Sequence, residues 1–139
     1  MTHEIMVRWQ GNLAFEAESL GGHFFIDADP SVGGEGNGLR PKALMLDALA
    51  GCTGIDIATL MPKMKVTPDR LYIKVVGELT DEHPKYYHKV KVEYHFFGDR
   101  LDTDKLNKMI QLSADKYCGV MAMFRKFAEV ELELQVHPA

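Results

Sequence analysis

Two cysteines, Cys52 and Cys118, are the residues of this sequence that can take part in the widest range of reactions. A cysteine attacks electrophiles as its thiolate, and oxidation to a sulfenic acid lets a second thiol close a disulfide. The two lie far apart in the chain and no Cys-x-x-Cys pair occurs, so neither a zinc ribbon nor a thioredoxin-type motif is present. A free cysteine is also commonly a small buried apolar side chain. Composition alone favours this inert interpretation, because reactive cysteines are the exception.

Other candidate sites are weaker. His83 and His88, with His95 nearby, could suggest a metal, but positions 83 and 88 of a strand face opposite sides. We therefore expect polar histidines and no bound metal. The run GGEGNG is not followed by the lysine and Ser/Thr of a phosphate-binding loop. Several methionines are typical of a core; beside Cys52 they would make its surroundings apolar. They are Met45, Met61, Met109, Met121 and Met123.

Length and charge limit the classes of protein. The chain has 139 residues, which predicts one domain over 1–139. Its net charge is −4 with both signs interspersed, and no basic block suggests a nucleic-acid partner. The polar first residues do not resemble a signal peptide, so we expect a cytoplasmic protein. Two cysteines in such a chain do not form a structural disulfide framework.

The segment that contains Cys52 is long and apolar. Pro41 suits the first turn of a helix, and the helix should run to about Met61, with Pro62 ending or kinking it. Its length could suggest a membrane span, but Asp47 and Asp56 would each cost roughly 2.5–3.5 kcal/mol at the bilayer centre. We therefore expect no membrane partner, and a helix buried in a soluble fold or between subunits.

The remaining elements surround this helix. Three short strands precede it, separated by turns and followed by a long loop over 29–40. Two alternating strands over about 71–75 and 90–96 follow it. Asp102 is a good N-cap for a second helix, a third helix should run from about Cys118 to Phe127, and a final strand covers about 130–136. The order βββ-α-ββ-αα-β predicts an α+β fold with an antiparallel sheet.

Three segments resemble the OsmC/Ohr family. The run RPKALMLDALAGCTGIDIATLM is similar to its central helix, with small residues before the first cysteine, and LSADKYCGVMAM is similar to its second cysteine block. The run EHPKYYHKVKVEYHFFG fits between them. The likeness covers nearly the whole chain. It is nearer to the OsmC-like branch, with its LSxxKYC block, than to the organic hydroperoxide resistance branch.

The resemblance implies an intertwined homodimer with its long helices at the core. It also implies a peroxide-reducing enzyme of the stress response that needs no bound cofactor. In this enzyme Cys52 attacks a small apolar hydroperoxide, Cys118 resolves it as a disulfide, and an external dithiol reduces the pair. The alternative is a catalytically silent dimer that binds a small apolar ligand at the subunit interface. A structural dimer with two inert cysteines is a third interpretation.

Electrostatics limit how Cys52 could be activated. Asp56 lies one helical turn on, where its carboxylate disfavours a thiolate. A cation must oppose it, and Arg40 is the nearest candidate, followed by Arg8. Cys118 is expected at the start of a short helix, where the helix dipole could stabilise its thiolate.

The sequence departs from the family pattern at one place. Family peroxidases usually carry a glutamate after the proline that begins the central helix, where it holds the arginine against the thiolate. Here Lys42 and Ala43 follow Pro41. Asp47 is the nearest acid, but it does not share the face of Cys52. The acid that would hold the arginine is therefore not identified from sequence.

Overall fold

The computed structural model describes residues 1–139 and divides into two compact units, Met1–Met45 and Leu46–Ala139. The first unit is an antiparallel sheet of β1 (Met6–Trp9), β2 (Phe15–Ser19) and β3 (Gly22–Ile26), in that order. A short helical turn, η1 (Pro30–Val32), follows. These are the three short strands that the alternating pattern predicts.

The first unit has almost no core of its own. Ala17 is its one buried apolar side chain, and Asp27 is its one buried charged side chain. Asp27 organises the loop, because its carboxylate accepts the backbone N–H groups of Ala28, Glu35 and Asn37. Large apolar side chains are exposed along the strands, among them Ile5, Met6, Val7, Trp9 and Phe25. A unit this small that buries so little apolar surface needs another surface to pack on.

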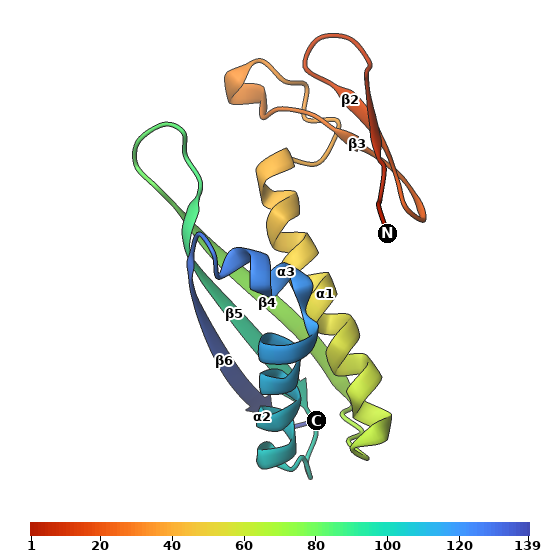
Figure 1. Ribbon diagram of the computed structural model, residues 1–139, viewed down its shortest axis with the longest axis vertical. Helices are drawn as coiled ribbons and strands as arrows, with labels where there is room; N and C mark the ends of the chain where they lie inside the picture. Colours follow the sequence, from red (N-terminus) through yellow and green to blue (C-terminus); the bar gives the residue numbers. More distant parts are fainter. The chain divides into compact units, whose positions relative to one another are not determined.

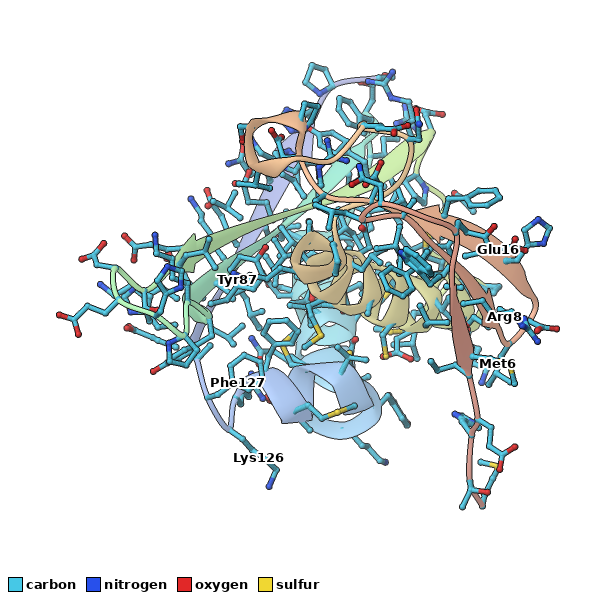
Figure 2. All side chains as sticks on the ribbon, turned by 90° about the horizontal axis from the view of Figure 1, so that it is seen from above. Met6, Arg8, Glu16, Tyr87, Lys126 and Phe127 are labelled. Atoms are coloured by element: carbon cyan, nitrogen blue, oxygen red, sulfur yellow. The ribbon has the colours of Figure 1, made fainter.

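The second unit is built on a sheet of three strands in the order β4 (Arg70–Leu79), β5 (Tyr87–Phe97) and β6 (Glu129–His137). Its helices are α1 (Pro41–Lys63), which belongs to this unit from Leu46 on, α2 (Thr103–Leu112) and α3 (Gly119–Phe124). All three helices lie on one face of the sheet (Figures 1 and 2). The mixed α+β class and the predicted order of elements are confirmed.

The pairing of the last strand corrects the expectation of an antiparallel sheet. β4 and β5 are antiparallel, but β5 and β6 are parallel, with Val92 opposite Leu132. The helices between the two strands carry the chain back to the start of β5, so this part is a β-α-β crossover. The alternation of apolar and polar residues in β6 predicts a strand with one covered face. The pattern is the same for a parallel and for an antiparallel strand, so it cannot distinguish the two.

Three boundaries also differ from expectation. Pro62 lies inside the last turn of α1 and does not end the helix before it. α3 is shorter than predicted, and a π-helical turn, η2 (Ser113–Tyr117), replaces the break that the pattern suggested before Cys118. The N-cap of α2 is as predicted, because the side chain of Asp102 accepts the backbone N–H groups of Asp104 and Lys105.

The core lies between the helices and the sheet. α1 buries one stripe at helical spacing, Leu49, Thr53 and Ile57. Gly77 leaves room for α1 and for the ring of Tyr87, since a Cβ there would lie 3.1 Å from Cδ1 of Leu46 on α1 and 2.6 Å from Cδ1 of Tyr87 on β5. Most of the other buried apolar side chains come from β5, α2 and α3, and include Val92, Tyr94, Phe96, Leu106, Met109, Met121 and Phe124.

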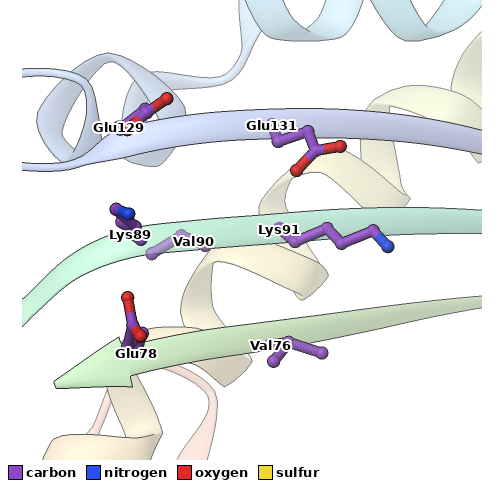
Figure 3. A pocket seen from close by; sticks show the side chains of 7 residues that line it. All are labelled: Val76, Glu78, Lys89, Val90, Lys91, Glu129 and Glu131. Carbon is purple, nitrogen blue, oxygen red and sulfur yellow. The ribbon is translucent and has the colours of Figure 1, made fainter.

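The other face of the sheet is polar. On the central strand, Lys89 lies between Glu78 of β4 and Glu129 of β6, and Lys91 lies between Val76 of β4 and Glu131 of β6 (Figure 3). Towards the other end, four planar side chains form a cluster, in which successive ring centroids lie 4.3–5.2 Å apart and the first and last lie 5.9 Å apart. In order they are Tyr72, His95, His137 and Phe97.

α1 is the one helix long and apolar enough to cross a membrane, by length and composition alone. In the structure its buried stripe packs on a sheet, and its Asp56 accepts a hydrogen bond from Ser113. Helix–sheet packing of this kind is that of a globular domain. The opposite side of α1 is an uncharged, exposed stripe, formed by Ala48, Gly51, Ile55, Ala58 and Pro62.

We predict that this stripe and the exposed apolar strands of the first unit are covered in a homodimer that buries well over about 2,000 Å². Ile55, with 70% of its surface exposed, should lie in the interface. Ile55→Asp should then shift the protein towards monomer in light scattering. Lys108→Glu, an exposed charge change on α2, is the control and should leave the dimer intact. A stable, folded wild-type monomer at micromolar concentration would contradict the prediction.

Candidate functional site

α1 positions Cys52 at the edge of the core. Cys52 precedes Thr53 of the buried stripe, so its side chain is directed partly inward and is half-buried. It packs against the core of the second unit and carries a free thiol.

Cys118 is positioned by the change from η2 to α3. π-Helical turns are rare and occur often at functional sites. This one ends where the backbone N–H of Cys118 donates to the carbonyl of Ser113 at 2.7 Å. Cys118 then caps α3, and its Sγ accepts the backbone N–H of Met121 at 3.3 Å. Only 3% of its surface is exposed.

Burial dominates the electrostatics of Cys118. Desolvation raises the pKa of its thiol from 9.0 to about 11, while the N–H of Met121 works in the opposite direction. The neighbouring Cys52 thiol and the Asp56 carboxylate add to the rise. The expected help from the helix dipole is therefore outweighed, because α3 is a short helix and the thiol is removed from water. At neutral pH Cys118 is a thiol and not a thiolate.

The structure brings the two predicted cysteines into one environment. Each comes from a different element, α1 for Cys52 and the start of α3 for Cys118, and both thiols are free. Cys52 is near enough to affect the ionisation of Cys118. One thiol is half-buried and the other is closed off, so the pair is asymmetric in its access to solvent.

A buried chain of hydroxyl groups runs beside the cysteines. The Oγ1 of Thr53 lies 2.8 Å from the Oη of Tyr94 and 2.7 Å from the Oγ of Ser113. The hydroxyl of Ser113 donates to Oδ2 of Asp56 at 2.8 Å. The four groups come from α1, β5 and η2, so this chain joins three elements of the second unit.

Tyr94 is the innermost member of this chain. Burial raises its pKa to about 12, the hydrogen bond with Thr53 acts against the rise, and the charges of Cys118 and Asp56 add to it. Arg125 is the nearby cation that opposes the rise. Its guanidinium donates to the carbonyl of Ala114 and to Asp115, both at 2.9 Å.

Asp56 forms the outer end of the chain. It lines a cavity of about 170 Å³ with Thr59, Leu60, Lys63 and Tyr117. The hydroxyl chain thus connects the surroundings of Cys118 with an opening at the surface.

The hydroxyl chain was missed from sequence, although a signal for it exists. Thr53, Tyr94 and Ser113 each occupy an inward position of an otherwise apolar face. Buried hydroxyl groups need partners, so three of them on facing elements predict a network. No feature of the sequence indicates which of them meet.

The two arginines proposed from sequence lie in the first unit. Arg40 donates to the carbonyl of Gly38 at 2.7 Å and lies 3.7 Å from a carboxylate oxygen of Asp29. Arg8 pairs with Glu18 at 2.8 Å. The pKa of Asp29 is lowered mainly by its hydrogen bonds with Ser31, and to a smaller extent by Arg40. An acid that holds Arg40 is therefore present, on the loop and not on the helix.

The histidines are engaged in pairs. His88 lies 3.3 Å from Glu78, and His95 lies between Glu93 and His137, 2.9 Å from each. His83 does not join them, so the three histidines singled out in the sequence do not converge. The structure gathers no set of three histidine, cysteine or acidic side chains that could hold a metal ion.

The sequence model of the OsmC-like proteins matches residues 34–133. This range is most of the chain and contains both cysteines and Arg40, so the chain belongs to the OsmC-like family, as the resemblance predicted. Protein YhfA of Escherichia coli (strain K12) is a relative. It is 26% identical over 130 residues, which cover 94% of this chain and 95% of that protein.

Solved structures show the same fold. A hypothetical protein from Aquifex aeolicus VF5 has a TM-score of 0.87 at 23% identity, with 100% of this chain and 98% of that chain covered. An organic hydroperoxide resistance protein OsmC from Legionella pneumophila has a TM-score of 0.72 at 17% identity, with 97% of each chain covered. OhrB of Bacillus subtilis, an organic hydroperoxide resistance protein, has a TM-score of 0.66 at 19% identity, with 97% and 98% covered.

The raised pKa of Cys118 predicts a pH dependence of stability. The thiol ionises near 9 in the unfolded chain and near 11 in the folded one, so folding keeps it protonated. Its contribution, about 2–3 kcal/mol at most, is complete below pH 9 and is lost as pH rises to about 11. Urea unfolding at several pH values should show a steeper loss for the wild type than for Cys118→Ala. Equal slopes for the two would contradict the prediction.

Proposed function

We propose that this protein is a thiol-dependent hydroperoxide reductase in which Cys52 attacks the peroxide and Cys118 resolves the product. The observation that carries the proposal is the asymmetric pair of free thiols in one local environment. Membership of the OsmC-like family supports it, as does the likeness in fold to organic hydroperoxide resistance proteins.

The reaction balances with these two residues and an external reductant. The Cys52 thiolate attacks the terminal oxygen of a hydroperoxide, the O–O bond breaks, and the alkoxide takes a proton to leave as an alcohol. Cys52 is then a sulfenic acid. The Cys118 sulfur displaces its hydroxyl group as water, and a disulfide forms. A dithiol restores both thiols by exchange.

The roles follow from access to solvent. Cys52 is half-buried, so a small peroxide can approach its sulfur. Cys118 is closed off and protonated, which suits a residue that must not be oxidised first. An apolar hydroperoxide fits best, because the residues around the thiols are mostly apolar.

Arg40 is our candidate for stabilising the Cys52 thiolate. A guanidinium has five N–H donors, and the contacts with Gly38 and Asp29 leave others free. Asp29 would take the role of the acid that orients the arginine. The homodimer would allow the arginine to come from the same chain or from its partner.

The redox pair has a direct test. One equivalent of tert-butyl hydroperoxide should lower the intact mass by two hydrogens and leave no alkylatable thiol. In Cys118→Ser, Cys52 should instead accumulate as a sulfenic acid, because no resolving thiol is present.

Cys52→Ser is the matched control, and it should leave Cys118 unoxidised by the same treatment. If the wild type keeps both thiols after hydroperoxide, the reductase proposal fails. The better-supported function would then be the binding of a small apolar ligand at the subunit interface.

The role of Arg40 is tested through the reactivity of Cys52. Arg40→Ala should slow alkylation of Cys52 near pH 7 by about tenfold and move its pH–rate profile to higher pH, since the thiolate loses a cation. Arg8→Ala tests the rival cation in the same assay. Unchanged rates in both variants, with Cys52 reactive only above pH 9, would exclude a preformed thiolate.

A further inference from the structure

We propose that Arg125 is a positioning residue for Cys118. Its guanidinium keeps the turn before Cys118 π-helical, and the form of this turn sets where the resolving sulfur lies. The inference rests on the proposed function and adds to it a residue that acts through Cys118.

A closed ring of hydrogen bonds contains Cys118. Its backbone N–H donates to the carbonyl of Ser113 at 2.7 Å, and its sulfur accepts the N–H of Met121 at 3.3 Å. The carbonyl of Met121 accepts the backbone N–H of Arg125 at 3.0 Å. The guanidinium of Arg125 donates to the carbonyl of Ala114, the residue after Ser113, at 2.9 Å. The start of η2 and the end of α3 are therefore tied together around Cys118.

Arg125 occupies the carbonyl that Cys118 would use in an α-helix. In an α-helix each N–H donates to the carbonyl four residues earlier, which for Cys118 is that of Ala114. Here the N–H of Cys118 reaches back five residues, to Ser113. Ala114 is buried, with 4% of its surface exposed, and a buried carbonyl needs a donor. The guanidinium supplies that donor, so the N–H of Cys118 remains bonded to Ser113.

The bond to Ala114 matters more than the ion pair with Asp115. The side chains of Arg125 and Asp115 are 40% and 60% exposed, and exposed ion pairs contribute little to stability. A hydrogen bond from a charged donor is stronger than one between neutral groups. Asp115 therefore helps to keep the guanidinium over η2, and the bond to Ala114 decides between a π-helical and an α-helical turn.

Loss of this bond moves Cys118. Without the guanidinium, the N–H of Cys118 becomes the donor for Ala114, and the turn closes one residue shorter. One helical residue corresponds to a rise of about 1.5 Å. A misplacement of this size slows a reaction between two groups on the order of 100-fold.

The step that depends on this placement is the attack of Cys118 on oxidised Cys52. The sulfur of Cys118 bonds to the sulfur of Cys52, and the S–O bond of the sulfenic acid breaks. The hydroxide that leaves takes the thiol proton of Cys118 and becomes water. Oxidation of Cys52 by the peroxide precedes this step and does not involve Cys118.

The test compares different side chains at position 125. Arg125→Met keeps a long apolar side chain and removes every N–H donor, whereas Arg125→Lys keeps N–H donors on one nitrogen. Both contacts of Arg125 come from its single nitrogen Nη1, so an ammonium with three N–H groups can replace it. Lys126→Met is the matched control, because it removes the neighbouring exposed cation.

The two chemical steps are followed separately. Each reduced variant is mixed rapidly with one equivalent of tert-butyl hydroperoxide, quenched, and weighed by intact mass. We expect oxidation of Cys52 at the wild-type rate in every variant. In Arg125→Met the sulfenic acid should persist, with disulfide formation slowed about 100-fold. Arg125→Lys and Lys126→Met should form the disulfide at close to the wild-type rate.

A crystal structure of reduced Arg125→Met gives a readout that a general loss of stability would not change. The N–H of Cys118 should donate to the carbonyl of Ala114 in this variant, and to that of Ser113 in Arg125→Lys. Arg125→Ala should behave as Arg125→Met, which covers a methionine variant that folds poorly.

Three results would overturn the positioning role. The first is a wild-type rate of disulfide formation in Arg125→Met, and the second is an equal slowing in Arg125→Lys. The third is an N–H of Cys118 that stays on Ser113 in Arg125→Met. Failure of the proposed function looks different, because the wild type itself would then form no sulfenic acid on Cys52, while the crystal structures would still show whether Arg125 sets the turn.

Discussion

The packing of α1 on the sheet is the interaction on which the second unit depends. Leu49 and Ile57 bury apolar surface one turn on either side of Thr53, whose hydroxyl would be costly to bury without a partner. Tyr94 and Ser113 supply the partners, and Asp56 completes the set. Apolar contacts hold the helix against the sheet, and the hydroxyl chain sets its register with β5 and η2. The place of Cys52 follows from that register, since it is the neighbour of Thr53.

Burial gives two similar side chains different properties. A helix N-cap favours a thiolate, and Cys118 has that position. It is nevertheless held as a thiol, because desolvation acts on the whole charge while a single N–H at 3.3 Å compensates only part of it. Cys52 lies on a side of α1 that is only half-buried, so small molecules can reach its thiol. Burial in the core therefore distinguishes Cys52 from Cys118 more than the local backbone conformation does.

Much of this structure could be read from the sequence, and the rest depends on contacts between distant segments. Alternation and turn residues predicted the strands, Pro41 and Asp102 marked the starts of two helices, and the two cysteine blocks indicated the family. The parallel pairing of β6 was not predicted, because alternation carries no direction. The π-turn before Cys118 and the hydroxyl chain were also missed, since each depends on which side chains meet across elements. The expected antiparallel sheet was wrong for the same reason, and the expected gain of Cys118 at the start of α3 is present but outweighed by burial.

The parallel pairing of β5 with β6 has a consequence for synthesis of the protein. β6 completes the sheet whose central strand, β5, is made some thirty residues earlier. Until β6 has been synthesised, β5 lacks one of its two neighbours, and the crossover that carries Cys118 has no complete sheet to pack on. The surroundings of Cys118 are therefore complete only after β6 has been made and has paired with β5.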